Sequence, residues 1–141
     1  MDSLCEWIDA GKCGGSFGTR CQQFTSVPRM RLANWGRLRV AQLYDDEVGI
    51  QQHRMDLLES GESQVKVDGT EEWRECRLFS RKERLALALA EALTLCPESS
   101  MCRIIFWYAH YTLGESEFIE LVVAIQSVNE WNFRYFVNSE E

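Results

Sequence analysis

The sequence predicts an all-α domain of five to seven helices, and two observations carry that prediction. Apolar residues recur at helical spacing in several segments, for example at positions 118, 121, 122 and 125, as on the buried face of an amphipathic helix. No segment alternates apolar and polar residues between hairpin turns, which is the pattern typical of strands. The best strand candidate, residues 65–67, is only three residues long.

The composition limits the class of protein. The chain has 141 residues, of which 45% are hydrophobic and 26% are charged, as in a single globular domain. No stretch approaches the roughly 18 consecutive apolar residues of a membrane span, so we expect no membrane partner. The first residues lack the apolar run of a secretory signal, which favours a cytoplasmic protein. The formal net charge of −7 makes a nucleic-acid partner unexpected, because phosphate binding requires a basic patch.

The glycines and prolines indicate where the helical domain begins. We expect a glycine- and cysteine-containing segment at residues 1–27, followed by a helical domain at residues 28–141. Pro28 precedes the first expected helix, which runs from about residue 30 to residue 43. A proline is tolerated at a helix start because its missing N–H would be unpaired there.

Residues 45–47, Asp-Asp-Glu, suit the first turn of a second helix that continues to about residue 58. Carboxylates are favoured there by the positive end of the helix dipole. One apolar side of this helix would consist of Tyr44, Val48, Met55 and Leu58.

The most apolar helix is expected at residues 83–95, after a polar connection at residues 59–70. It opens with a capping box, in which Ser80 and Glu83 each bond the backbone N–H of the other. The helix is apolar nearly all round, so we expect it to be buried. Pro97 ends it, because the residue before a proline disfavours the helical conformation.

Two further apolar helices close the chain. One covers residues 101–111, and the last begins after Gly114, an acceptable N-cap. Together they carry more aromatic surface than one small domain needs, which indicates burial at a subunit contact. Positions in the core, or at an interface for the histidine, are expected for Trp107, Tyr108, His110 and Trp131.

The six cysteines are Cys5, Cys13, Cys21, Cys76, Cys96 and Cys102. Without a secretory signal, free thiols are favoured over disulfides. No pair has C-x-x-C spacing, and the gaps do not match the close ligand pairs of structural zinc sites. We therefore expect no metal, and nothing in the sequence indicates a cofactor.

Two stretches of the chain resemble the carboxymuconolactone decarboxylase and alkylhydroperoxidase D-like proteins. Residues 73–94, WRECRLFSRKERLALALAEALT, are similar to the second half of those proteins, and residues 120–137 stand where they have a closing apolar helix. The family's helix ends in N-x-W-N-R, whereas here a phenylalanine intervenes and the arginine is displaced to Arg134. The resemblance covers about residues 30–137. It implies a helical trimer or hexamer with a small pocket near a subunit boundary.

The resemblance also implies a site. Peroxidase members of the family carry C-x-x-C-x-x-x-H at a helix start, where one thiolate attacks the peroxide, the second cysteine resolves the sulfenic acid and the histidine relays protons. The cysteine positions are Asp46 and Gly49 in this chain, whereas the histidine position is kept as His53. A glutamate usually completes the relay, and its position is Asn34. We therefore expect thiol peroxidase chemistry to be lost.

Three residues are candidates for the chemistry that remains: His53, Asp46 and Glu91. His53 is either an acid/base group in a pocket that has lost its thiols, with Gly49 leaving open space one turn away, or a hydrogen-bonded structural histidine. Asp46 is either a general base or a charge that stabilises the helix start. Glu91 lies in an apolar helix and needs a partner, because a buried unpaired carboxylate is costly.

The partner of Glu91 separates two interpretations. As a pocket acid, Glu91 would face His53. As a structural residue, it would form an ion pair with an arginine such as Arg39 or Arg134.

These observations leave three hypotheses about function. The first is a divergent alkylhydroperoxidase D-like protein that uses His53 with Asp46 or Glu91 on a small organic acid or lactone. The second is a non-catalytic ligand-binding or assembly protein on the same scaffold. The third is a peroxidase that uses a relocated cysteine, for which Cys76 is the first candidate.

Overall fold

The computed structural model of the protein describes the backbone of residues 26–139 and the side chains of residues 31–134. This part of the chain forms six α-helices and one short 3-10 helix without any strand, which confirms the predicted all-α class. The predicted segment 1–27 lies outside the described residues except for its last two, which begin the first of the described helices. The elements are α3 (Ser26–Tyr44), α4 (Glu47–Glu59), α5 (Gln64–Asp68), η1 (Thr70–Glu72), α6 (Arg81–Leu95), α7 (Ser100–Leu113) and α8 (Glu115–Ser139).

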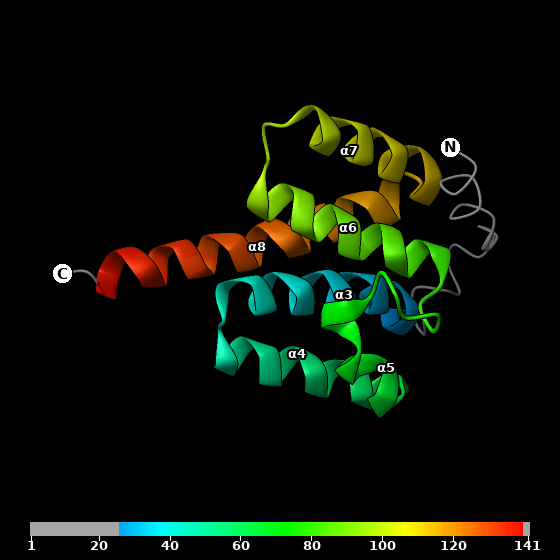
Figure 1. Cartoon of the computed structure of the whole chain (residues 1–141), viewed down its shortest axis with the longest axis horizontal. Helices are drawn as coiled ribbons and strands as arrows, with labels where there is room; N and C mark the ends of the chain where they lie inside the picture. The colour runs from blue at the N-terminus through cyan, green and yellow to red at the C-terminus, as the bar shows by residue number, and fades with distance from the viewer. Residues whose placement is uncertain (1–25, 140–141) are drawn as a thin grey trace.

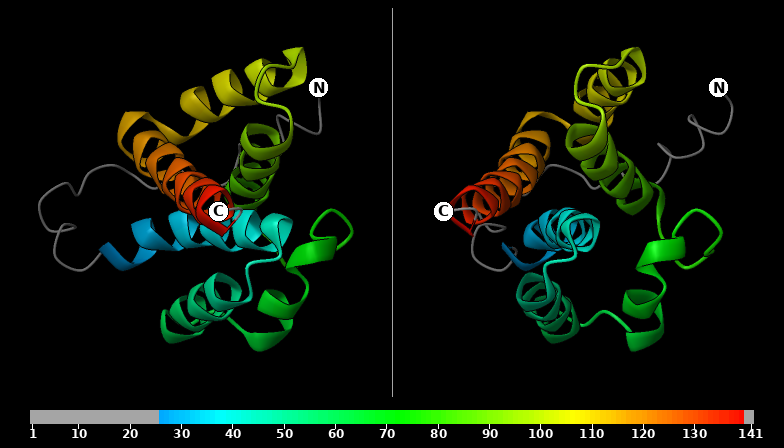
Figure 2. Two further views of the ribbon diagram at one scale, coloured as in Figure 1. Left: turned by 90° about the vertical axis from the view of Figure 1, so that its left-hand side faces the viewer. Right: turned by 60° about the vertical axis from the view of Figure 1, so that its left-hand side comes forward.

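Helix α3 lies at the centre of the described fold. It packs against α4 on one side and against α6 and α8 on the other (Figures 1 and 2). Helix α7 packs against α6 and α8. Helix α8 has 25 residues, and its C-terminal end extends beyond the other helices in Figure 1.

Two hydrophobic clusters flank α3, and α6 contributes to both. Residues 85–92 of α6 are all buried, as its sequence predicted. The first cluster lies among α3, α6, α7 and α8 and contains Leu32, Val40, Leu85, Ala86, Leu89, Ala90, Ala109, Leu113, Phe118, Leu121, Ile125 and Val128. The second lies among α3, α4, α5, α6 and the segment before α6, and contains Trp35, Leu38, Leu57, Val67, Trp73, Phe79, Leu87 and Ala88.

Helices α3 and α8 approach closely at Gly36. A Cβ atom on Gly36 would lie 3.0 Å from Leu121 Cδ1 and 3.1 Å from Ile125 Cγ1. A larger residue at this position would therefore have to displace core side chains of α8.

Side-chain caps define the start of four helices. The predicted capping box is present, because Ser80 Oγ accepts a hydrogen bond from Glu83 N at 3.1 Å and Glu83 Oε1 accepts one from Ser80 N at 2.8 Å. Gly114, with a φ of 86°, ends α7, and its carbonyl accepts a bond from Phe118 N in the first turn of α8. The residues whose side chains cap a helix N-terminus are Asp46, Ser63, Ser80 and Ser99.

The connection predicted at residues 59–70 is wrong in part, because it contains α5 and the start of η1. The strand candidate at residues 65–67 belongs to α5. A helix of five residues is too short to be stable alone and shows little sequence pattern. Contacts with the rest of the fold must therefore stabilise it.

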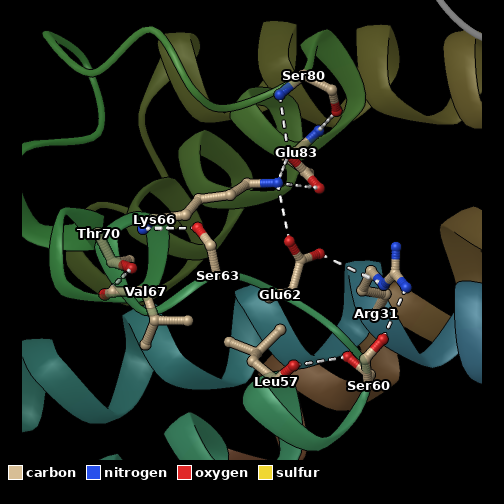
Figure 3. Close-up of polar contacts among 10 residues, drawn as sticks. All are labelled: Arg31, Leu57, Ser60, Glu62, Ser63, Lys66, Val67, Thr70, Ser80 and Glu83. Carbon is tan, nitrogen blue, oxygen red and sulfur yellow. Dashed lines mark hydrogen bonds and ion pairs between the residues drawn. The ribbon is translucent and has the colours of Figure 1, made fainter.

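A group of four charged side chains, the Lys66 cluster, supplies those contacts: Arg31, Glu62, Lys66 and Glu83 (Figure 3). Lys66 Nζ lies 3.0 Å from Glu62 Oε1 and 2.9 Å from Glu83 Oε1. Arg31 Nε lies 3.3 Å from Glu62 Oε2, and the Arg31 guanidinium also donates to Ser60 O at 2.9 Å. The cluster thereby ties the segment between α4 and α5 to both α3 and α6.

The apolar side predicted for α4 is wrong at three of its four positions, because Tyr44 is the last residue of α3 and is exposed, and Val48 and Met55 are exposed as well. Val48 and Met55 are 81% and 53% exposed. The buried side chain of the helix is Leu57, with Ile50 and Leu58 packed partly against the second cluster. Helix α3 and α5 cover only that side, so Val48 and Met55 face away from the core.

The core positions expected for the aromatics of the last two helices are also wrong in part. Trp107 and Trp131 are 68% and 64% exposed, whereas Tyr108 packs against the first cluster. None of the described helices combines the length and apolar character needed to cross a membrane. Among the described side chains of α7 and α8, the large exposed apolar ones are Met101, Ile104, Phe106, Trp107, Tyr111, Ile119, Val123, Trp131 and Phe133.

Candidate functional site

A tight turn joins α3 to α4 and places Asp46 directly before α4. Asp45 N donates to Gln42 O at 3.1 Å and Asp46 N donates to Ala41 O at 3.0 Å. Asp45 has a φ of 63°, a conformation that aspartate tolerates better than most residues. Because the turn is short, α4 folds back along α3 (Figure 1).

Asp46 caps α4 rather than facing an open pocket. Its Oδ1 accepts a hydrogen bond from Gly49 N at 3.1 Å. A Cβ atom on Gly49 would lie 2.5 Å from Asp46 Oδ2. The space that we expected Gly49 to leave open is therefore filled by the Asp46 carboxylate, which corrects that expectation.

His53 is partly buried one turn after Gly49. Its Nδ1 atom is shielded from solvent and has no hydrogen-bond partner among the described residues. Burial lowers the pKa of His53 below its ordinary value of 6.5, and the Arg37 guanidinium lowers it further, against the opposing charges of Asp56 and Asp46. The imidazole is therefore mainly neutral at pH 7.

Arg37 is a member of this site that the sequence analysis missed. Its Nη1 donates to Asn34 Oδ1 at 2.7 Å, and Asn34 is buried at the position where the resemblance places a relay glutamate. Burial lowers the pKa of Arg37, and the charges of Asp56 and Glu120 act in the opposite direction. The signal was its spacing, because Arg37 follows Asn34 by three residues and so lies on the same face of α3.

Glu91 is held by three donors away from this site. Its Oε2 accepts from Arg39 Nε at 2.8 Å and from Trp73 Nε1 at 2.9 Å, and its Oε1 lies 2.8 Å from Arg74 Nη2. Burial raises the pKa of Glu91, but the bonds from Trp73, Arg74 and Arg39 outweigh it and the pKa falls below its usual value. Of the two arginines that the sequence offered, the structure pairs Glu91 with Arg39, whereas Arg134 lies 3.1 Å from Glu130.

The structure thus brings two of the three candidate residues into electrostatic range of each other. Asp46 and His53 lie on one helix, and the Asp46 charge acts on the pKa of His53, but no hydrogen bond joins their side chains among the described residues. The described contacts of Glu91 include neither of them.

Three of the cysteines lie among the described residues. Cys76, Cys96 and Cys102 are free, and no hydrogen bond within the described side chains joins one of them to His53. Burial, with a smaller effect of Cys96, raises the pKa of Cys102, which disfavours its thiolate. In the same part of the chain no group of histidine, cysteine or carboxylate side chains is arranged to hold a metal ion.

Comparison with known proteins finds a relative but no family. No protein-family model matches the chain. Over 96 residues, which are 68% of this chain, the sequence is 28% identical to the uncharacterized protein YdfG of Bacillus subtilis (strain 168). The aligned segment spans 65% of YdfG, slightly less than two thirds of that protein. Because YdfG is uncharacterized, the similarity brings no activity with it.

Proposed function

We propose that the chain is a divergent alkylhydroperoxidase D and carboxymuconolactone decarboxylase-like protein that lacks thiol peroxidase activity and acts on, or binds, a small organic acid or lactone at His53. One observation carries the proposal. His53 has an unpartnered, solvent-shielded Nδ1 about two turns into α4, whose start carries Asp46 and Gly49 at the positions where the resemblance implies two thiols. An imidazole that is neutral at pH 7 can accept or donate a proton.

The remaining candidate acids limit what the site can do. Asp46 is engaged as a helix cap, and Glu91 is fully paired with other groups. His53 is therefore the group that we propose for proton transfer, with Asp46 as an electrostatic neighbour rather than a direct partner. We also propose a cytoplasmic location, which the free thiols Cys76, Cys96 and Cys102 support.

The first experiment measures consumption of an organic hydroperoxide by the purified full chain with a dithiol reductant. We expect no rate above that of a variant in which all six cysteines are serine. A rate that the cysteine-free variant loses would contradict the proposal and favour the relocated-cysteine hypothesis, and single variants, Cys76→Ser first, would then identify the thiol.

A second experiment restores the missing groups. Asp46→Cys and Gly49→Cys must be made together, because a Cβ on Gly49 meets the Asp46 carboxylate and a cysteine at 46 removes that obstacle. Combined with Asn34→Glu, they should give hydroperoxide consumption that disappears on His53→Gln. A folded triple variant without such activity would contradict the resemblance at this site.

An assembly role is the second candidate, favoured by the exposed apolar side chains of α7 and α8. We propose that this surface binds a second copy of the chain in a trimer or hexamer. A large exposed apolar surface is more typical of an interface than of a free surface.

A further inference from the structure

We propose that Cys96 and Cys102 are a redox-sensitive pair, which forms a reversible disulfide across the turn between α6 and α7 when the protein meets a low-molecular-weight disulfide such as oxidised glutathione. Both are free thiols in the structure. His53 lies on α4, so this inference goes beyond the proposed function and does not depend on it. Its basis is a serine hydroxyl that bonds the backbone of both cysteines.

Hydrogen bonds of the turn hold the two cysteines close together. Cys96 caps the C-terminus of α6, and Ser99 caps the N-terminus of α7. The Ser99 hydroxyl donates to Cys96 O at 3.0 Å and accepts from Cys102 N at 3.0 Å. Because one oxygen atom contacts both, these two backbone atoms lie at most 6.0 Å apart. Disulfides join residues whose Cα atoms are roughly 4.4–6.8 Å apart, which is a separation of the same order.

The packing of α6 on α7 leads toward the same turn. Ile105 and Ala109 follow Cys102 at helical spacing, and both pack in or against the first cluster, as does Leu93 of α6. Leu93 precedes Cys96 by three residues. Cys102 therefore lies on the side of α7 that shares a cluster with the end of α6, and the electrostatic effect of Cys96 on Cys102 agrees with this proximity.

The two thiols differ in access, which sets the order of their reactions. Cys96 is exposed, whereas Cys102 is only 3% exposed. Burial raises the pKa of Cys102, and the charge of Cys96 raises it further. A disulfide in solution should therefore react first with Cys96, because the attacking species is an accessible thiolate. Once Cys96 carries a neutral mixed disulfide, its charge no longer opposes the ionisation of Cys102.

The exchange proceeds in two balanced steps. The Cys96 thiolate attacks one sulfur of oxidised glutathione, which forms a mixed disulfide and releases one glutathione thiolate. The Cys102 thiolate then attacks the Cys96 sulfur, which forms the Cys96–Cys102 bond and releases the second glutathione thiolate. The protein loses two protons and two electrons, and oxidised glutathione gains them as two molecules of reduced glutathione.

The position of the pair makes the disulfide reversible. Intracellular disulfides of this kind are usually transient, and exposed disulfides are reduced more easily than buried structural ones. The sulfur of Cys96 is on the exposed side of the pair, so reduced glutathione can attack it and reverse the two steps. We therefore expect an excess of reduced glutathione to restore both thiols.

The test maps the disulfides of the full chain after incubation with oxidised glutathione. Remaining thiols are blocked with iodoacetamide, the protein is digested with trypsin, and the peptides are analysed by mass spectrometry. Residues 85–103 form one tryptic peptide, which contains Cys96 and Cys102 and no other cysteine. We expect this peptide unalkylated and lighter by two hydrogen atoms, and doubly alkylated after treatment with excess reduced glutathione.

Single variants then test the order of the two steps. In Cys102→Ser the reaction should stop at a mixed disulfide, so that one glutathione stays on Cys96. In Cys96→Ser the peptide should stay free of glutathione, because Cys102 is buried. Cys76→Ser is the matched control, since Cys76 is another free thiol of the described chain, and it should leave the Cys96–Cys102 disulfide unchanged.

Ser99 variants test whether the turn positions the pair. Ser99→Ala removes both hydrogen bonds of the hydroxyl and should lower the ratio of disulfide to mixed disulfide about fivefold, the equilibrium factor that corresponds to one capping interaction. Ser99→Thr keeps a hydroxyl and should restore the ratio. Ser63→Ala removes a comparable cap from α5 and should not alter it, which separates positioning of the cysteines from a general loss of stability.

Three results would overturn the inference: a wild-type peptide that carries glutathione on Cys96 while Cys102 is alkylated, a peptide alkylated at both cysteines, or pairing of Cys96 with Cys76 to the same extent as with Cys102. The map of the wild type needs no variant, so it stands even if a Ser99 or cysteine variant fails to fold. The reaction consumes a disulfide rather than a hydroperoxide, so neither its success nor its failure bears on the proposed function at His53.

Discussion

At the scale of single residues, two polar side chains of the fold differ in whether their buried atoms have hydrogen-bond partners. Glu91 has donors on both carboxylate oxygens, from Arg39, Trp73 and Arg74. His53 Nδ1 has no partner among the described residues. A satisfied buried ion contributes to the free energy of unfolding, whereas an unsatisfied buried atom costs free energy and suggests a use in binding or proton transfer.

Glu91→Gln should lower the free energy of unfolding by about 3 kcal/mol, because it leaves Arg39 and Arg74 without their partner near the core. Urea unfolding at pH 7 measures the change. The control is Glu130→Gln, the same substitution in an exposed pair with Arg134, and it should have a much smaller effect. Equal losses in the two variants would show that the contacts of Glu91 are not stabilising.

The lowered pKa of His53 predicts how stability depends on pH. The unfolded chain takes up a proton on this residue near pH 6.5, and the folded chain takes it up only at lower pH. The unfolded state therefore binds more protons in that window, and the free energy of unfolding should decline as the pH falls from about 6.5 toward the folded pKa.

Unfolding of the wild type and of His53→Gln between pH 5 and pH 7 isolates this contribution. The variant should show a smaller decline, and His110→Gln should retain the decline of the wild type. A slope that is the same in the wild type and in His53→Gln would argue against the shift.

The candidate site shows how much can be predicted from the sequence for single residues. A buried carboxylate needs a cation, so the partnership of Glu91 with Arg39 could be proposed from residue types alone. The contact between Asp46 and Gly49 could not be predicted in this way, because a glycine in a sequence does not show which neighbouring side chain occupies the space beside it. Arg37 was missed for a similar reason, since the sequence does not show that its guanidinium bonds Asn34 rather than a carboxylate among the described residues.

At the scale of elements, α5 depends on its surroundings. Its five residues are held by the Lys66 cluster, and Lys66 Nζ also lies 5.3 Å from the ring centroid of Trp35 and 5.7 Å from that of Phe79. Burial lowers the pKa of Lys66, but its bonds to Glu83 and Glu62 outweigh it and raise the pKa overall. The ammonium is therefore charged at all ordinary pH values.

Lys66→Met should destabilise the protein by about 3 kcal/mol, because Glu62 and Glu83 would keep their charges while losing the ammonium. Hydrogen exchange of amides 62–72 should also become faster than in the wild type. Arg54→Met, which removes the more exposed link between α4 and α5, should change both measurements less. Unaltered exchange in Lys66→Met would mean that the Lys66 cluster does not hold α5.

The elements that the sequence predicted well are those whose pattern is local. Helix α6 has a capping box, an apolar composition and a proline shortly after its end, and each of these acts within a few residues. The start of α8 after Gly114 was recognised for the same reason. Helix α5 and the exposed side of α4 depend on which surface α3 presents to them, and no local pattern contains that information.

At the scale of the whole molecule, the exposed apolar side chains of α7 and α8 bear on assembly. The proposed assembly predicts that the full chain has a larger mass in solution than its 16.4 kDa monomer. Trp107→Ser combined with Trp131→Ser should reduce that mass, because aromatic residues at the centre of an interface typically contribute about 2 kcal/mol or more each.

Light scattering after gel filtration measures the mass over a range of concentrations. Val48→Ser is the control, since Val48 is an exposed apolar residue of α4, and it should leave the mass unchanged. A monomeric wild type would contradict the assembly proposal.

The central position of α3 has a consequence for how the protein unfolds. Leu32 and Val40 of this helix belong to the first cluster, and Trp35 and Leu38 belong to the second. Because α3 contributes side chains to both clusters, unfolding of this helix would disrupt both clusters together. The described fold should therefore melt in a single cooperative transition, with equal calorimetric and van't Hoff enthalpies, and a fragment that begins at α6 should not fold alone.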